Sequence, residues 1–496
     1  MRLGTLLGDL QADLVGCDRD TEIVNLAVDS RRVGPGDAFL AVAGLAHDGH
    51  AFIATAIAAG ARVILLQRGR VAPPAHPHVV LADTASSLPG LAARAFGEPA
   101  EHLRLAGVTG TNGKTTVTFL VAAMLAAADR KHARLGTTGD WIVDHAAPAA
   151  FTTPFPLDLQ RVLADALARG ATDLVMEVSS HGLAQGRVAP LRYDAVGLTS
   201  FSQDHLDFHG TMDAYLAAKC LLASDYRRPG GVTVAAVDDQ PAAAAFLAAA
   251  GHDGPVWRAS RGADRTADIA VLEDMSDRAG FTVRLRTPAG EGVLRSPLVG
   301  AYNLDNLLVA LGLALGLGVP LEAALAGLAD CRGAPGRLER VQVPGAAGPA
   351  VFVDYAHTPD AVARALAAVR PACAGRLWIV LGCGGDRDPS KRPIMGRLAA
   401  AGADVLVATS DNPRSEPPPA IVEQMIAGVP AEQRDRVVAI VDRAAAIAHA
   451  ITRAAGDDLV LVAGKGHEDY QVLGAARIHF DDREHAARAL AARGPA

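Results

Sequence analysis

The stretch that decides the fold is LRLAGVTGTNGKTT, residues 103–116. Its first six residues are typical of a buried strand, and an apolar helical pattern follows from Thr115 to Ala128. Between the two, Gly110 and Gly113 let backbone N–H groups turn toward phosphate oxygens, and Lys114 can reach the β- and γ-phosphates. The stretch therefore predicts a strand, a phosphate-binding loop and a helix, the start of an α/β nucleotide-binding domain.

The match to the full phosphate-loop pattern is imperfect. Val108 stands where the first glycine is usual, and Gly107 lies one residue earlier. A lone Gly-Lys-Thr is common by chance, but the flanking strand and helix favour nucleotide binding. We assign the following residues to the nucleotide phosphates, and the resemblance named below makes this nucleotide ATP: Gly110, Thr111, Asn112, Gly113, Lys114, Thr115 and Thr116.

Composition excludes several classes of protein. Half of the 496 residues are hydrophobic and 20% are charged, which is typical of a globular protein with more than one domain. A net charge of -7 gives no basic field for nucleic acid. The five cysteines form no CxxC pair, which indicates neither a zinc site nor a disulfide framework and fits a reducing cytoplasm. Since we find no signal-peptide core and no long apolar run, we expect neither export nor a membrane span.

Two breaks in composition predict three domains. A turn-forming cluster at 97–99 and another near 333–336 divide the chain into 1–99, 100–334 and 335–496. In the middle block, apolar strands alternate with Ala/Leu-rich helices, which predicts a mostly parallel sheet. The third block repeats this alternation and reads as a Rossmann-like domain.

An acidic residue, Glu177, follows the apolar strand of residues 174–176. A carboxylate at the end of a strand could hold magnesium together with the loop residue Thr115. The alternative is an ordinary helix start, because Ser179 and Ser180 are both good N-caps.

Two further segments are ambiguous when taken alone. Residues 204–210, DHLDFHG, are either a solvated loop or a functional one that contains His205. Lys219 lies within an apolar helical pattern at 215–222. This context by itself favours a lysine that extends its ammonium to solvent over a functional lysine.

Four polar segments in the third block follow four predicted strands: 354–359, 382–388, 411–414 and 464–468. The carboxyl ends of parallel strands meet at one edge of a sheet, where α/β proteins bind ligands. Each segment alone is an ordinary turn, but together they predict a binding site.

With these residues assembled, the chain resembles the Mur ligase family, and in particular the members that add diaminopimelate. Motifs along nearly the whole chain carry the resemblance: Asp29-Ser30-Arg31, Asp48-Gly49-His50, Thr152-Thr153-Pro154, Pro335-Gly336-Arg337-Leu338-Glu339 and Glu468. The family implies an N-terminal domain for the UDP end of the substrate, a central ATPase and a C-terminal domain for the amino acid.

The resemblance also implies a reaction and its partners. ATP, a co-substrate used with Mg²⁺, would phosphorylate the D-glutamyl side chain of UDP-N-acetylmuramoyl-L-alanyl-D-glutamate. The amine of meso-2,6-diaminopimelate would then attack this acyl phosphate, a step in peptidoglycan biosynthesis. We expect a cytoplasmic monomer with no nucleic-acid partner.

Single residues take roles from the family's motifs. Catalytic positions are Lys114, Lys219 as a carbamate, Glu177 and His205, and metal positions are Thr115, Glu177 and His205. Positions for the UDP-substrate are Ser30, Thr152, Thr153, Ser179, Gln185 and Arg187. Further nucleotide positions are Asn303, Arg337, Asp354 and His357. Positions for diaminopimelate are Arg387, Asp411, Asn412, Pro413, Arg414, Gly464 and Glu468.

Some features limit the resemblance. Phe151 stands where a polar residue can help to bind substrate, and Ala236 stands where an asparagine is usual. Arg414 marks the diaminopimelate-adding members, although it could be a surface arginine after a turn. The alternatives are a ligase that adds L-lysine, a folylpolyglutamate synthetase and a non-catalytic nucleotide-binding subunit.

Overall fold

The computed structural model describes residues 1–44 and 47–494. They form two compact units, which we describe separately. The first unit consists of Met1–Lys114, Leu125–Arg258 and Gly312–Val319, and the second of Thr115–Met124, Ala259–Leu311 and Pro320–Ala496. No helix in the described ranges is long and apolar enough to cross a membrane.

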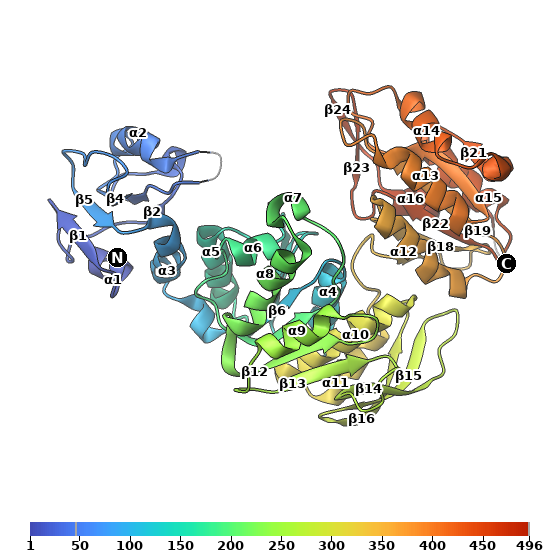
Figure 1. Ribbon diagram of the computed structural model, residues 1–496, viewed down its shortest axis with the longest axis horizontal. Coiled ribbons are helices and arrows are strands. Elements are labelled where there is room, and N and C mark those ends of the chain that lie inside the picture. Colours follow the sequence, from blue (N-terminus) through green and yellow to red (C-terminus); the bar gives the residue numbers. More distant parts are fainter. Residues whose placement is uncertain (45–46, 495–496) are drawn as a thin grey trace. The chain divides into compact units, whose positions relative to one another are not determined.

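The first unit begins with a five-stranded sheet in the order β1-β5-β4-β3-β2 (Figure 1). Its elements are α1 (Leu3–Leu7), β1 (Ala12–Val15), β2 (Leu26–Ala27), β3 (Ala38–Leu40), α2 (Ile53–Ala58), β4 (Val63–Gln67), β5 (His78–Leu81) and α3 (Thr84–Ala95). Successive side chains of β4 point to opposite faces, so Val63 and Leu65 join one core while Ile64 and Leu66 join another.

The same unit contains a second sheet with the strand order β12-β11-β6-β10-β7-β8-β9. Its elements are β6 (Arg104–Thr109), α4 (Lys114–Ala127, which continues into the second unit), β7 (His132–Leu135), β8 (Asp140–Ile142), β9 (His145–Ala147), α5 (Pro156–Ala168), β10 (Asp173–Glu177), α6 (Ser180–Ala184), β11 (Tyr193–Leu198), α7 (Leu206–His209), α8 (Met212–Ser224), β12 (Arg227–Ala236) and α9 (Ala242–Ala249). The strands from β12 through β7 pair in parallel, whereas β7, β8 and β9 pair antiparallel, contrary to the expectation of a mostly parallel sheet there. Glu177 lies opposite Val108. Glu177 and the loop after β6 therefore lie at the same edge.

In the second unit, the expectation of a mostly parallel middle sheet is wrong for one group of strands. Here β13 (Val256–Ser260) pairs in parallel with β14 (Ile269–Asp274), but β14, β15 (Phe281–Thr287) and β16 (Gly290–Ser296) are antiparallel. Only residues 288 and 289 join β15 to β16, which is too short for a parallel crossover. The helices α10 (Ala301–Gly316) and α11 (Leu321–Ala329) follow.

The C-terminal sheet of the second unit has the order β17-β18-β22-β19-β20-β21. Its elements, with the hairpin β23–β24, are β17 (Glu339–Val341), β18 (Ala350–Asp354), α12 (Pro359–Val369), β19 (Leu377–Cys383), α13 (Lys391–Gly402), β20 (Val405–Ser410), α14 (Pro418–Ala427), β21 (Val437–Ala439), α15 (Arg443–Arg453), β22 (Leu459–Ala463), β23 (Tyr470–Leu473), β24 (Ala476–His479) and α16 (Asp482–Ala491). All its strands except β17 are parallel. The helices α12, α13 and α14 cover one face, and α15 and α16 cover the other. This confirms the predicted Rossmann-like architecture.

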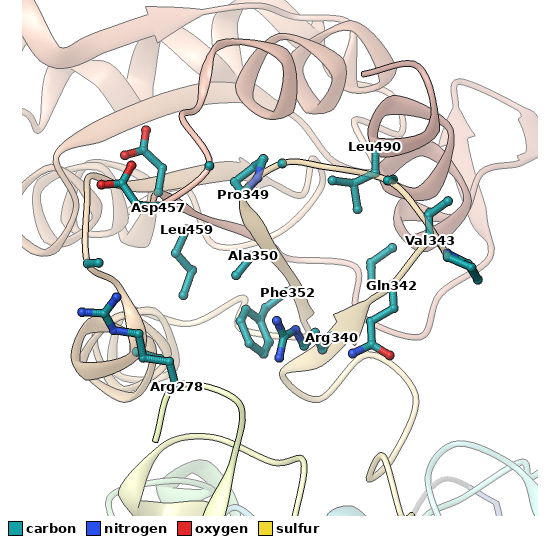
Figure 2. A pocket seen from close by; sticks show the side chains of 18 of the residues that line it. Arg278, Arg340, Gln342, Val343, Pro349, Ala350, Phe352, Asp457, Leu459 and Leu490 are labelled. Atoms are coloured by element: carbon teal, nitrogen blue, oxygen red, sulfur yellow. The ribbon is translucent and has the colours of Figure 1, made fainter. Parts of the chain in front are cut away.

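A cavity of about 720 Å³ lies at the amino ends of β18 and β22. Figure 2 shows Phe352, Leu459 and Leu490 around it, with Arg340 beside Phe352. The predicted site segments follow the carboxyl ends of these strands, at the opposite edge of the sheet. None of the predicted site residues lines this cavity.

Candidate active site

The phosphate-binding loop is shaped by its glycines. Gly110 has φ +149°, and a Cβ there would overlap the Thr199 hydroxyl, so only glycine fits. Lys114 Nζ donates to the carbonyl oxygens of Gly110 at 2.8 Å and Thr111 at 3.0 Å. The lysine therefore lies over the loop that the sequence assigns to phosphate.

Glu177 is buried at the end of β10, with 1% of its surface exposed. Thr137 holds both of its oxygens: the backbone N–H donates to Oε1 at 2.8 Å, and the hydroxyl donates to Oε2 at 3.1 Å. A Cβ at Gly136 would overlap the carboxylate, so glycine is required for this close approach. Ser179 caps α6 by accepting from the Gly182 N–H, whereas the Glu177 side chain takes no part in that cap.

The residues predicted to bind the UDP-substrate lie next to this carboxylate. The hydroxyls of Thr152 and Thr137 are 3.0 Å apart. Thr153 donates to the carbonyl oxygen of Glu177 at 3.0 Å and accepts from the Ser179 N–H at 2.9 Å. Five of the six predicted residues therefore belong to one hydrogen-bond network with Glu177: Thr152, Thr153, Ser179, Gln185 and Arg187.

The sixth, Ser30, is buried in a short 3₁₀ helix, Ser30–Arg32, beyond this network. Residues 25–29 on its N-terminal side line a cavity of about 440 Å³ together with residues 155–158. The cavity thus lies between the segment that leads to Ser30 and the segment that follows Thr153, within the first unit.

Lys219 lies on the buried face of α8, with 1% of its surface exposed. The expectation from its local context, an ammonium that reaches solvent, is wrong, because Tyr215, Ala218 and Leu222 are buried on the same face. Its Nζ lies 4.4 Å from the centre of the Tyr215 ring. Burial, and secondarily the charge of Lys114, hold the pKa of Lys219 well below its ordinary value.

His205 belongs to a group of aromatic rings around Tyr215. Its ring is 4.8 Å from that of His181 and 6.1 Å from that of Tyr215. The ring of His209 is 5.1 Å from that of Tyr215, and its Nε2 lies 3.0 Å from the Ser180 hydroxyl. The segment is largely exposed, as a solvated loop would be, but its histidines gather beside the residue that contacts Lys219.

Burial lowers the pKa of His181, and the neighbouring His205 and His209 lower it further. The sequence analysis did not select His181 or His209. Only their spacing in the sequence could have pointed to these two histidines: His181 lies four residues after Glu177, and His209 lies four residues after His205.

The C-terminal loops meet at Glu468. Asn412 Nδ2 donates to Glu468 Oε2 at 2.9 Å. Lys465, which is fully buried, lies 3.3 Å from Glu468 Oε2 and 3.5 Å from Asp411 Oδ1. The structure thus brings together residues that are more than fifty positions apart, and Lys465 is a member that sequence reasoning missed.

Arg414 is half-buried, so the alternative of a surface arginine does not describe it well. Its φ is +52°, an uncommon conformation for a non-glycine residue, and its N–H donates to the Val472 carbonyl at 3.1 Å. Its Nη1 donates to the Gly385 carbonyl at 2.7 Å. Arg387 is exposed, and within the described ranges its side chain hydrogen-bonds only to the Asp386 carbonyl.

Three of the further nucleotide positions are neighbours. Asp354 accepts from the N–H groups of Leu338 and Ala356, at 2.7 and 2.9 Å. Arg337 lies over the Tyr355 ring at 4.7 Å, and the His357 ring is 4.5 Å from that of Tyr355. The fourth, Asn303, is buried in α10, where it donates to the Val299 carbonyl at 2.8 Å.

If these loops bind diaminopimelate as the sequence predicts, Lys465→Met should raise the KM for that amino acid by roughly tenfold to a hundredfold, because losing charged hydrogen bonds costs about 1.5 to 3 kcal/mol. Methionine keeps the length but leaves the carboxylates of Asp411 and Glu468 without their cation. Steady-state kinetics with each substrate varied measures this, and the exposed Lys131→Met is the matched control. An unchanged KM for the amino acid would contradict the role of Lys465.

Comparison with family models identifies the class of protein. The model described as Mur ligase family, catalytic domain, matches residues 22–91, Mur ligase middle domain matches 108–314, and Mur ligase, glutamate ligase domain matches 336–466. The chain belongs to the Mur ligase family and has its three-domain α/β architecture. The predicted resemblance is confirmed, while the boundaries at 99 and 334 stay a prediction.

Individual relatives narrow the class. The chain is 47% identical to the UDP-N-acetylmuramoyl-L-alanyl-D-glutamate:2,6-diaminopimelate ligase of Synechococcus elongatus, over 96% of this chain and 95% of that protein. A solved structure of a ligase with the same name matches with a TM-score of 0.74 at 31% identity, covering 99% of both chains. The Mycobacterium tuberculosis folylpolyglutamate synthase has the same fold, with a TM-score of 0.62 at 20% identity over 83% of this chain and 96% of that one.

Proposed function

We propose that this Mur ligase joins the amine of meso-2,6-diaminopimelate to the D-glutamyl side-chain carboxylate of UDP-N-acetylmuramoyl-L-alanyl-D-glutamate, with ATP as co-substrate. The similarity to a relative of that name over 96% of the chain supports the substrates. One structural observation supports the chemistry: Glu177 shares a hydrogen-bond network with Thr152, Thr153 and Arg187. This arrangement suits a site where a substrate carboxylate is activated beside a metal.

The residues present fit Mg²⁺, which prefers oxygen ligands. Thr115 offers a hydroxyl and Glu177 a carboxylate, which Thr137 keeps in a fixed orientation. Bound Mg²⁺ would neutralise phosphate charge. His205 would serve a second ion.

The other residues act on the substrates. Lys114 and the backbone N–H groups of its loop would bind the β- and γ-phosphates, with Asn303, Arg337, Asp354 and His357 on the nucleotide. A free carboxylate is a poor electrophile, so phosphorylation makes the glutamyl carbon open to attack. Glu468 would receive an ammonium of diaminopimelate, while Arg387 and Arg414 would bind its carboxylates.

Phosphate release measured with UDP-muramoyl dipeptide, ATP and one amino acid at a time tests this function. We expect turnover with diaminopimelate and little with L-lysine or L-glutamate. Turnover that requires a folate in place of the dipeptide would favour a folylpolyglutamate synthetase. Nucleotide binding without any turnover would favour a non-catalytic subunit.

We also propose that the domains span 1–99, 100–334 and 335–496 and that the enzyme works as a monomer in the cytoplasm. Limited proteolysis tests the boundaries, since linkers are cut before compact domains. Light scattering after size-exclusion chromatography tests the monomer.

Specificity for diaminopimelate should depend on Arg414. Diaminopimelate and L-lysine differ by one carboxylate, which a guanidinium can bind through two parallel hydrogen bonds. We expect Arg414→Ala to reduce the preference for diaminopimelate, as a ratio of kcat/KM values, by roughly tenfold to a hundredfold. Arg414→Lys should restore only part of it, and the exposed Arg453→Ala should change nothing. A preference that survives in Arg414→Ala would refute the assignment.

A further inference from the structure

Two phenylalanines lie exposed beside the predicted substrate site. Phe151 is 50% exposed and Phe155 is 41% exposed. Their ring centres are 5.0 Å apart and the planes are nearly perpendicular, at 89°. Because these rings stay largely exposed, burial of apolar surface contributes little free energy to holding them side by side. Another interaction must account for their arrangement.

That explanation is Arg187, whose guanidinium faces both rings. Its Cζ lies 4.0 Å from the centre of the Phe155 ring and 5.6 Å from that of Phe151, both within the range of a cation–π contact. Arg187 is half-buried, so water is partly excluded there and the cation–π attraction is stronger than at an open surface; the same burial lowers the pKa of Arg187.

Two hydrogen bonds complete the environment of Arg187. Its Nε donates to Gln185 Oε1 at 2.8 Å, and its Nη1 donates to the Thr153 carbonyl at 3.1 Å. Its Nη2 donates no hydrogen bond to any residue that the structure describes. The arginine is therefore held on several sides and keeps a charged donor for a ligand.

We propose that Phe151 and Phe155 form an aromatic clamp that positions Arg187 for an anionic group of the UDP-muramoyl dipeptide. The proposal rests on the proposed function for the identity of this substrate. An arginine loses much rotamer freedom when it is fixed, so fixing it before the substrate binds removes that cost from binding. Phe151 would thus act through Arg187 in place of the polar contact usual at its position.

The main test is Phe151→Leu, because Phe155 also lines the cavity of about 440 Å³. We expect the KM for UDP-muramoyl dipeptide to rise roughly 2- to 30-fold, the range of a cation–π contact. The kcat and the KM values for ATP and diaminopimelate should stay within about twofold of wild type. Phe151→Tyr should behave like wild type, and Trp141→Leu, another exposed aromatic of the first unit, is the matched control.

A double-mutant cycle separates the clamp from direct contact with the substrate. In an Arg187→Ala background, Phe151→Leu should cause no further rise in KM, because the residue it positions is absent. The same rise in both backgrounds would show that Phe151 touches the substrate itself and would overturn the proposal. Equal changes in all three KM values would also overturn it, since they would indicate a general structural effect.

An NMR measurement tests the clamp without any activity. The Nε–H resonance of Arg187, assigned by its loss in Arg187→Lys, should move in Phe151→Leu because a ring current is removed. An unchanged resonance would contradict the clamp. A wild-type enzyme that fails to use UDP-muramoyl dipeptide would instead contradict the proposed function, so the two failures are distinguishable.

Discussion

Replacing Lys219 with alanine should reduce ligation nearly to zero, and formate or acetate added in solution should restore part of the rate. The reason is the state of the side chain. Lys219 is 1% exposed, and burial holds its pKa well below the ordinary value, which favours the neutral amine. The Asp204 carboxylate raises this pKa, but less than burial lowers it, and within the described residues Asp204 lies 3.5 Å from His205 Nε2 and forms no ion pair with Lys219.

A neutral amine can attack carbon dioxide. A nitrogen–carbon bond forms, one proton leaves the nitrogen, and the product is a carbamate anion. We propose that the neutral amine is converted in this way into an anion, which would suit the proposed site for a metal and an acyl phosphate. Alanine leaves space in which a small carboxylate can take the place of the carbamate.

The measurement is the rate of phosphate release with and without added acid. Lys131→Ala, at an exposed lysine, should keep the wild-type rate and show no response to the acid. Lys219→Arg keeps a positive charge and cannot form a carbamate, so we expect it to be inactive. Full activity of Lys219→Arg would refute the carbamate.

The sequence predicted the parts of the fold that follow from short-range patterns. The expected strand at 103–108 and helix at 115–128 appear as β6 and α4, each within one residue. The four polar segments of the third block begin at the last residues of β18 and β19 or directly after β20 and β22, because the apolar pattern of a buried strand stops where the chain leaves the core. These signals are local, and so they can be read from one sequence.

What could not be predicted depends on contacts between distant segments. The sequence does not distinguish Thr137 from the other threonines. Only the pairing of β7 with β10 brings it to Glu177, which lies forty residues later in the chain. Nothing in the sequence around Lys465 distinguishes it from other lysines. Its role becomes visible only in the structure, where the ends of β20 and β22 place it against Asp411. Lys219 was judged from its helix alone to reach solvent, and the packing around α8 buries it instead. The antiparallel pairing of β15 with β16 is different, because the two residues that join these strands are a local signal that was missed.

Glu177 should be as critical as Lys219, for an electrostatic reason. It is the predicted carboxylate ligand of Mg²⁺, and removing one preorganised charge-stabilising group typically costs on the order of a hundredfold to a thousandfold in rate. We therefore expect Glu177→Ala to lower kcat roughly a hundredfold to a thousandfold. The Mg²⁺ concentration needed for the half-maximal rate should rise as well.

Glu177→Gln separates charge from shape. Glutamine can still accept from the Thr137 N–H at Oε1, so the network with Thr137 survives while the negative charge is lost. We expect it to lose nearly as much activity as Glu177→Ala. Asp140, buried nearby on β8, is the matched control for the loss of a buried carboxylate: burial raises its pKa to about 6, it is not a predicted metal position, and Asp140→Asn should change kcat far less. Melting temperatures of all three variants close to that of wild type would show that the fold survives. Near-normal activity of Glu177→Ala at a saturating Mg²⁺ concentration, with the fold intact, would remove Glu177 from the metal site.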